Sequence, residues 1–380
     1  MKFATASAAS TIPVVDDREF TRVLLCDDSA VARAMLERLL VTEPAIRIVG
    51  KAVNGLEAVR AVQAGGIDVV LLDVEMPIMD GLVALPRLLE ADHAVRVLMT
   101  SSLTTRGAGI ALEALRLGAA DFIPKPSSMG ASATDDRFRA ELVAKVLGLG
   151  RQCRAQRGRE QRIGRSASVR IAAPSASGLQ LRPAPRLAPS VLAIGSSTGG
   201  PAALLSLFQA LGNRVGVPIL LTQHMPATFT AQLASHIQRL GGLTCSEAVH
   251  GEALRPGHVH LAPGNRHLTV TGRDASAMVA LTDDAPENFC RPAVDPMLRS
   301  LSAAFPGRVM VLMLTGMGQD GLAGAQRVVA DGGSVIAQDE ASSVVWGMPG
   351  AVARAGICHA VLPLSDIAPK LLLHVARRGA

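Results

Sequence analysis

The sequence has few features of a membrane or secreted protein. No apolar run reaches the roughly 18 residues that a membrane span needs, and the longest runs, VMVLML and DVVLLDV, have the length of strands. The first 20 residues lack a basic start followed by an apolar core, so we expect no signal peptide. The five cysteines form no C-x-x-C pair, which is typical of free thiols in a reducing compartment. We therefore expect a cytoplasmic protein without membrane insertion.

Aromatic residues are missing where positive charge is concentrated. The net charge is +6, but residues 151–190 contain nine arginines and one glutamate, so this segment alone carries +8. It has no aromatic residue on which a nucleic-acid base could stack. Its Arg, Ala, Ser and Pro content without apolar periodicity is typical of a linker. We predict a flexible linker over residues 141–190 and no nucleic-acid partner, with a DNA-binding regulator as the alternative.

On both sides of this segment, strand-like and helix-like patterns alternate. Five βα units occupy residues 22–148, and the alternation resumes at Val191. Such alternation predicts parallel, doubly wound sheets. We therefore expect an α/β protein with two doubly wound parallel-sheet domains, over residues 20–140 and 191–378. Residues 257–285 look like hairpin strands inserted in the second sheet.

Polar side chains follow four strands of the first region. Asp27 and Asp28 end the first strand, Asp73 ends the third, and Ser101 and Lys125 follow the fourth and fifth. In parallel sheets, ligands bind beyond the carboxyl ends of the strands. Three converging carboxylates repel one another, and Mg²⁺ with its preference for oxygen ligands would relieve this repulsion. A hydroxyl and an ammonium group across the crevice could hold a phosphoryl group on one carboxylate.

The same four stretches, LLCDDSAVAR, DVVLLDVEMPIMDG, VLMTSS and DFIPKP, resemble the response-regulator receiver domain. The resemblance implies a flavodoxin-like fold that is phosphorylated on Asp73 with the help of Mg²⁺. It also implies the roles of the other residues: Asp27 and Asp28 with the backbone of Glu75 as metal ligands, Ser101 as the switch hydroxyl, and Lys125 as the lysine typical of the family.

In the second region, three strand ends deliver Ser197, His224 and Asp320 to the same edge of the expected sheet. A serine needs a base to act as a nucleophile at neutral pH, and the base needs an acid to fix its tautomer. The segment GSSTG also fits the G-x-S-x-G pattern of the nucleophile elbow, although the order Ser, His, Asp differs from that family. We therefore predict a serine hydrolase triad.

The glycine-rich loop GSSTGG permits a second interpretation. A glycine-rich turn before a helix suits phosphate binding through backbone N–H groups. The loop matches neither G-x-G-x-x-G nor a P-loop. The residues favour the hydrolase over a nucleotide-binding module under phosphorylation control, without excluding the latter.

Six stretches between residues 191 and 375 resemble the catalytic domain of the CheB chemotaxis methylesterases: AIGSSTGGPAAL, LLTQHMPATFT, GHVHLAPGNRHL, RPAVDPMLRSL, MLTGMGQDGLAGA and AQDEASSVVWGMPGAVA. The resemblance implies a Rossmann-like domain with Ser197 as nucleophile, His224 as base and Asp320 as the residue that orients His224. Backbone N–H groups at Thr198 and Met317 are candidates for the oxyanion hole. The family usually has alanine where Ser196 stands, so this chain has two adjacent hydroxyls.

The resemblance also implies the reaction and the partners. The expected substrates are glutamate methyl esters and selected glutamines on the cytoplasmic helices of methyl-accepting chemotaxis receptors. A CheA-type histidine kinase would donate the phosphoryl group. The esterase chemistry itself should need no cofactor. The receiver is expected to cover the catalytic crevice until phosphorylation loosens the interface. His258, His260 and His267 lie close together in the sequence, but we expect them to be structural rather than zinc ligands.

Overall fold

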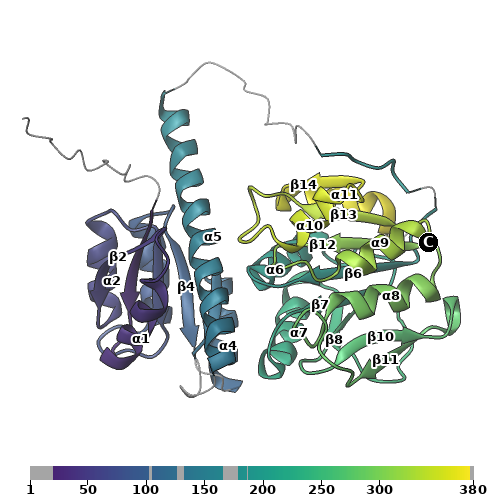
Figure 1. Cartoon of the computed structure of the whole chain (residues 1–380), viewed down its shortest axis with the longest axis horizontal. Coiled ribbons are helices and arrows are strands. Elements are labelled where there is room, and N and C mark those ends of the chain that lie inside the picture. The colour runs from purple at the N-terminus through teal and green to yellow at the C-terminus, as the bar shows by residue number, and fades with distance from the viewer. Residues whose placement is uncertain (1–19, 102–104, 126–131, 166–178, 186, 377–380) are drawn as a thin grey trace, which may run out of the picture.

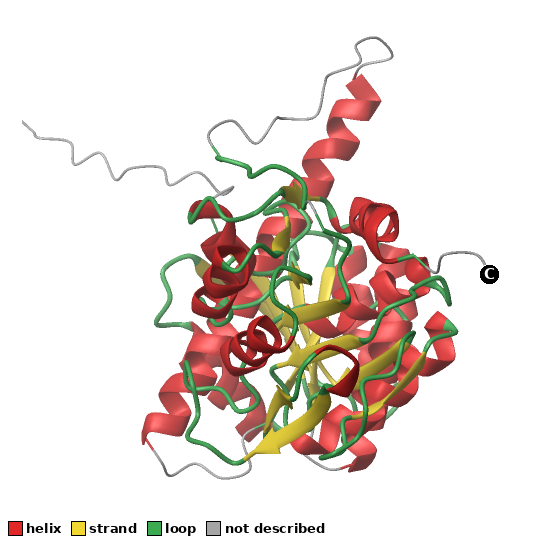
Figure 2. Cartoon of the chain, turned by 90° about the vertical axis from the view of Figure 1, so that its right-hand side faces the viewer, coloured by secondary structure: helices red, strands yellow, loops and turns green. Residues whose placement is uncertain are grey.

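Two parallel sheets form the centre of the protein. The computed structural model describes residues 20–101, 105–125, 132–165, 179–185 and 187–376. Helices cover both faces of each sheet (Figures 1 and 2). Strands β3 and β6 are buried along their whole length, as expected for parallel strands covered on both faces. The predicted fold class of two doubly wound α/β domains is confirmed.

The first domain contains a sheet in the order β2-β1-β3-β4-β5, and all neighbouring strands are parallel. Side-chain caps mark the starts of its helices: Ser29, Asn54 and Asp80 each accept a hydrogen bond from a backbone N–H in the first turn. The strands are β1 (Thr21–Cys26), β2 (Ile46–Ala52), β3 (Val69–Asp73), β4 (Arg96–Ser101) and β5 (Asp121–Pro124), and the helices are α1 (Ala30–Leu40), α2 (Gly55–Gln63), α3 (Gly81–Ala91), α4 (Thr105–Arg116) and α5 (Ser132–Arg165).

Helix α5 extends far into the segment that was expected to be a flexible linker. Residues 141–165 of the expected linker 141–190 are helical. Arg154 and Arg157 form ion pairs with the buried carboxylate of Asp68 at 3.8 and 2.6 Å. The expectation of irregular structure is therefore wrong for residues 141–165, because these two arginines hold the helix against the sheet. Arginines in internal ion pairs are not available to a phosphate backbone.

The second domain contains a parallel seven-stranded sheet in the order β14-β13-β12-β6-β7-β9-β8. The three central strands β12, β6 and β7 are neighbours, so the residues that follow them meet at one edge. The strands are β6 (Val191–Ser196), β7 (Ile219–Gln223), β8 (Thr244–Glu247), β9 (His258–Leu261), β12 (Val309–Met313), β13 (Ser334–Gln338) and β14 (Ala360–Leu362), and the helices are α6 (Gly200–Leu211), α7 (Ala227–Gly241), α8 (Val294–Ala304), α9 (Leu322–Ala330), α10 (Met348–Arg354) and α11 (Leu364–Val375).

The region 257–285 differs in part from the expected inserted hairpin. Strand β9 belongs to the parallel sheet, whereas β10 (His267–Thr271) and β11 (Met278–Thr282) form a separate antiparallel pair. His258 and His260 are buried with their rings in contact, and their ring nitrogens bond to Thr244, Glu252 and neighbouring groups. Because protein atoms already occupy these nitrogens, the pair fits the expected structural role.

The two domains share an apolar interface. Phe122 of β5 stacks on Phe229 of α7 with ring centroids 4.8 Å apart, and α4 packs against α6 and α7. Gly148 of α5 lies against Val344, so closely that an added Cβ would come within 2.0 Å of the Val344 carbonyl oxygen. Figure 1 shows α5 between the first sheet and the second domain. The first domain thus packs against the second through α4, β5 and α5.

None of the helices in the described part of the chain combines the length and apolar character needed to cross a bilayer.

Candidate active site and receiver site

The ends of β6, β7 and β12 bring the three predicted triad residues to one edge of the sheet. Ser196 pairs with Gln223 in the β6–β7 register, so Ser197 and His224 are the next residues on neighbouring strands. The backbone N–H of His224 donates to the Ser196 carbonyl oxygen at 3.1 Å. The Nε2 atom of His224 lies 2.8 Å from Oδ2 of Asp320. The three residues therefore lie at the same edge of the sheet, as expected for residues that follow parallel strands.

The two adjacent serines have different environments. Ser196 is fully buried at the end of β6, and its hydroxyl donates to Oε1 of Gln223 at 2.6 Å. Ser197 is partly exposed beyond the strand, and its hydroxyl makes no hydrogen bond within the described residues. Ser197 is therefore the serine that a substrate can reach. Its Oγ is not bonded to His224 in this state, and catalytic hydrogen bonds commonly tighten only when substrate binds.

Asp320 is buried and held by several donors. Besides His224, the backbone N–H groups of Val294 and Asp295 donate to its carboxylate at 2.6 and 3.2 Å. These are the first two residues of α8, so the carboxylate lies at the positive end of that helix. Burial opposes ionisation, but the hydrogen bonds with His224 and the backbone outweigh it, and the pKa of Asp320 is lowered. Asp320 is thus a fixed carboxylate beside the imidazole.

The charge on His224 is stabilised by its neighbours. Burial disfavours the imidazolium, but the hydrogen bonds to Asp320 and to Cys290 outweigh burial and raise the pKa of His224 to about 9. Sγ of Cys290 lies 3.4 Å from Nδ1 of His224. Because Nε2 is bonded to Asp320, Nδ1 is the nitrogen left for the Ser197 hydroxyl. In this structure, Cys290 lies at that nitrogen.

The loop after β6 uses most of its backbone N–H groups within the protein. The N–H of Ser197 donates to Thr315 and that of Gly200 donates to Ser197, while the N–H of Gly199 donates to Asp121 of the first domain. A phosphate cradle needs these groups to be free, so the phosphate-binding interpretation of the loop is disfavoured. The N–H groups of Thr198 and Met317 donate to no hydrogen bond within the described residues, as an oxyanion hole requires.

Sequence reasoning missed two residues beside the triad, Asn288 and Cys290. The amide of Asn288 donates to Oδ1 of Asp320 and to Oδ2 of Asp295, at 3.0 Å in each case. Both residues lie in a short turn before the Arg291–Pro292 bond, outside any periodic pattern. Because these residues do not follow a strand, nothing in the neighbouring sequence indicates that they lie close to the triad.

The receiver-like residues also come together. Nζ of Lys125 lies 2.8 Å from both Oδ2 of Asp27 and Oδ1 of Asp73. Burial raises the pKa of Asp73 above its ordinary value, although the ammonium of Lys125 opposes this shift. Ser101 is buried at the end of β4, next in chain order to Thr100, which pairs with Asp73 across the sheet. The predicted crevice of acids, hydroxyl and lysine is therefore present.

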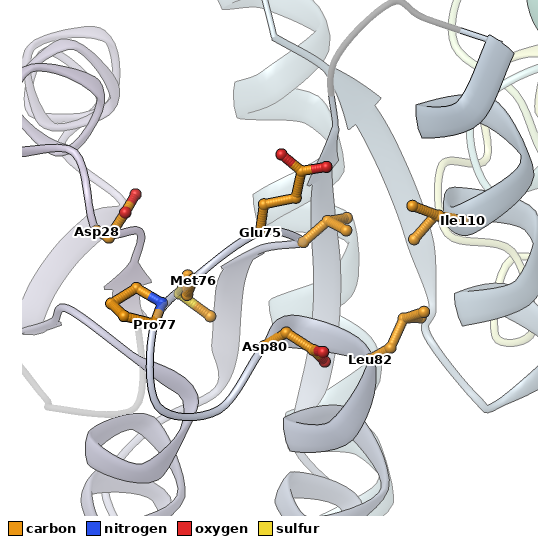
Figure 3. Close-up of a pocket in the computed structure, with 8 residues that line it drawn as sticks. Asp28, Glu75, Met76, Pro77, Asp80, Leu82 and Ile110 are labelled. Carbon is orange, nitrogen blue, oxygen red and sulfur yellow. The ribbon is translucent and has the colours of Figure 1, made fainter.

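A pocket of about 560 Å³ opens beside these acids (Figure 3). Asp28 and Glu75, both exposed, line it, and carboxylate oxygens of Asp27, Asp28 and Asp73 lie within 4.8 Å of one another. Three oxygen donors at this spacing suit a hard divalent cation such as Mg²⁺. The residues at the pocket therefore fit the metal that the sequence predicted.

Known proteins match this arrangement along nearly the whole chain. The family model of the CheB methylesterase matches residues 192–371, and that of the response regulator receiver domain matches residues 23–132. A protein-glutamate methylesterase/protein-glutamine glutaminase 1 from Paramagnetospirillum magneticum is 50% identical over 369 residues, covering 94% of this chain and 97% of the relative. The chain belongs to the CheB methylesterase family.

Two further known proteins are similar to all or part of this CheB methylesterase. A protein-glutamate methylesterase/protein-glutamine glutaminase from Azospirillum brasilense is 50% identical over 366 residues, covering 94% of this chain and 93% of the relative. The crystal structure of the Thermotoga maritima CheB methylesterase catalytic domain is 38% identical, covers 49% of this chain and 99% of that chain, and has a TM-score of 0.48. The two family models show that the protein joins a receiver domain to a methylesterase domain.

Proposed function

We propose that the protein hydrolyses glutamate methyl esters, and deamidates selected glutamines, on the cytoplasmic helices of methyl-accepting chemotaxis receptors. Phosphorylation of Asp73 by a CheA-type histidine kinase controls the reaction in the cytoplasm. The observation that carries this proposal is the meeting of Ser197, His224 and Asp320 beyond three neighbouring strands. All five cysteines are free thiols, which supports a reducing compartment.

In the acylation step, Oγ of Ser197 attacks the ester carbonyl while Nδ1 of His224 accepts the hydroxyl proton. The carboxylate of Asp320 holds the imidazole through Nε2 and stabilises the charge that forms on it. His224 then returns the proton to the leaving oxygen, and methanol departs. With a glutamine side chain the leaving group is ammonia. The triad needs no metal or cofactor for these steps.

The oxyanion and the second half-reaction use the same loop. The free N–H groups of Thr198 and Met317 donate to the negative oxygen of the tetrahedral intermediate. Water, activated by His224, then attacks the acyl-serine and releases the glutamate carboxylate. Because neither N–H donor has a partner among the described residues, no hydrogen bond to those residues has to break first.

The receiver supplies the control. Its β5 and α5 contact loops beside the triad, because Asp121 accepts a hydrogen bond from Gly199 and Gly148 lies against Val344. Phosphorylation of Asp73 changes the charge beside Lys125 and weakens this interface. Asp27, Asp28 and the Glu75 backbone would hold Mg²⁺, which would offset the negative charge of the incoming phosphoryl group. Ser101 hydrogen-bonds to that group after transfer.

The test is methanol release from methylated receptor membranes, with and without a small-molecule phosphodonor. We expect Ser197→Ala to lose activity by a factor on the order of 10⁴ or more. Ser196→Ala is the matched control, because it removes one buried hydroxyl and leaves the neighbouring serine in place. We expect it to lose less than about tenfold.

Two results would overturn the assignment. If Ser197→Ala kept full activity and Ser196→Ala were inactive, the nucleophile would be Ser196 and not Ser197. An Asp73→Asn variant that still responds to the phosphodonor would remove Asp73 as the acceptor. Absence of methanol release from the unaltered protein, in both conditions, would reject the esterase reaction itself.

A further inference from the structure

Residues 287–290 form a tight turn beside the triad, with Asn288 and Phe289 as its two central residues. The backbones of Glu287 and Cys290 exchange hydrogen bonds in both directions, at 3.1 and 2.8 Å. The central residues Asn288 and Phe289 have φ values of 50° and 62°, as a type I′ turn requires. Asparagine tolerates this conformation, but phenylalanine does so only with strain. Strained backbone of this kind is retained where the surroundings require it.

The turn directs its side chains in different ways. The amide of Asn288 lies against Asp320, and the thiol of Cys290 lies against His224. Phe289, the residue between them in the sequence, is 86% exposed. Glu287 forms a paired contact with the guanidinium of Arg299 on α8, at 2.9 and 2.5 Å. The turn is therefore attached to α8 and to two members of the triad.

Asn288 lies between two buried carboxylates. Asp320 and Asp295 are 3% and 5% exposed, and the Asn288 amide donates to both. Asp295 is otherwise fixed by the backbone N–H of Gly324 at 2.6 Å. Burial and the nearby charge of Asp320 raise the pKa of Asp295. A neutral group with two N–H donors offsets the repulsion between these carboxylates without changing their charge.

We propose that Asn288 is a positioning residue of the esterase reaction, which bridges Asp320 and Asp295 and keeps Asp320 charged and aimed at His224. The inference rests on the proposed function, because it concerns the same triad. The charged and titratable groups around the bridge are Asp320, Asp295, His224, Cys290 and the Glu287–Arg299 pair. Asn288 does not touch the reacting atoms and acts through Asp320.

The test compares Asn288→Gly with Phe289→Gly. Glycine suits a positive φ at both positions, so neither variant adds backbone strain. Without the amide, Asp320 binds a proton more readily and the imidazole of His224 becomes more basic. Both changes move the acid limb of the pH profile of kcat/KM to higher pH. We expect Asn288→Gly to lower kcat about 10- to 100-fold, with KM within about threefold.

Phe289→Gly should keep the kcat and the pH profile of the unaltered protein, because it removes only an exposed ring. A third variant, Asn288→Gly with Asp295→Asn, removes the second charge. We expect its acid limb to return toward the original pH, since Asp320 then has no buried carboxylate beside it. Thermal unfolding of each variant establishes that it is folded.

The outcomes separate this inference from the proposed function. If the unaltered protein releases methanol in a Ser197-dependent way but Asn288→Gly keeps its kcat and pH profile, the positioning role is wrong and the esterase stands. If Phe289→Gly shifts the profile as much as Asn288→Gly, the turn backbone and not the amide is responsible, and the inference is also wrong. If neither the unaltered protein nor any of the variants released methanol in a Ser197-dependent way, the proposed function itself would be rejected.

Discussion

The carboxylate of Asp121, in the receiver, accepts a hydrogen bond from the backbone N–H of Gly199, two residues after Ser197, at 2.9 Å. Gly199 has a φ of 74° and precedes the first turn of α6, so this N–H points out of the helix start. An anion at that position is stabilised by the helix. The loop after β6, which carries Ser197, is therefore hydrogen-bonded to the receiver domain that we propose controls the esterase.

Removing this contact should raise the basal esterase rate. Asp121 also pairs with Lys145, whose side chain is buried, and an unpaired buried ammonium would cost about 3–5 kcal/mol. The informative variant is therefore Asp121→Ala combined with Lys145→Met. A hydrogen bond to a charged acceptor contributes about 1.5–3 kcal/mol. We expect methanol release without phosphodonor to increase about 10- to 100-fold.

The matched control for that experiment is the exposed pair Lys51 and Glu37, which lies 2.7 Å apart. Replacing it by Met and Ala removes the same charges at the surface, away from the Asp121 contact. Its basal rate should not change. An unchanged rate in the Asp121 and Lys145 double variant would show that the contact does not restrain the esterase.

Divalent cation affinity should increase when Lys125 is replaced. Its ammonium lies 2.8 Å from both Asp27 and Asp73, and therefore offsets the charge that attracts the cation. A unit charge at about 4 Å contributes roughly 4 kcal/mol at an effective dielectric constant of 20. We expect Lys125→Met to bind Mg²⁺ at least about tenfold more tightly in calorimetric titration, with Lys51→Met unchanged. If Lys125→Met bound Mg²⁺ equally or more weakly, the cation would not bind at the carboxylates that contact Lys125.

The placement of the three triad residues at one edge of the sheet was predictable from sequence, because it depends on where the strands end. Ser197, His224 and Asp320 each follow an apolar run, and parallel topology brings such positions together. The contacts of Asn288 and Cys290 were not predictable, because these residues lie in an irregular turn whose partners are set by packing. Figure 2 shows how the loops between strands and helices lie around the central sheet.

The extent of α5 was missed for a different reason. Its buried residues Leu142, Val146, Leu149 and Cys153 recur at helical spacing, so the apolar pattern continues to residue 153. The dense arginines obscured that pattern, since local composition alone is typical of a linker. Asp68, one of the acids that pair with Arg157, lies 89 residues away in the sequence, and only the folded chain shows this relationship.

A methyl group at Gly316 should displace the catalytic loops. An added Cβ would lie 2.9 Å from the Cβ of Ser197 and 2.5 Å from the sulfur of Met348. Both distances are shorter than real contacts, so Ser197 or the backbone leading to Met317 must shift. We expect Gly316→Ala to lower kcat about 100-fold, as small misplacements of catalytic groups do.

Gly158→Ala is the control for that substitution. Gly158 lies in α5 and an added Cβ there meets no atom within 4 Å. Alanine in place of glycine should stabilise the helix by up to about 1 kcal/mol without changing the esterase rate. A Gly316→Ala variant with full activity would mean that the loop accommodates the methyl group without moving Ser197.

The contact between Cys290 and His224 predicts an unusual pH dependence. With a pKa of about 9, His224 is neutral in only about one molecule in a hundred at pH 7. Only the neutral imidazole can accept the Ser197 proton, so basal kcat/KM should rise tenfold per pH unit up to about pH 9. Cys290 contributes to raising this pKa, so Cys290→Ala should lower the pKa and increase the rate at pH 7. Cys290→Ser keeps a hydrogen-bonding group beside His224, so its rate at pH 7 should lie between those of the unaltered protein and Cys290→Ala. A rate that is constant between pH 7 and pH 9 would show that His224 is already neutral in the active protein, and that the thiol does not govern its protonation.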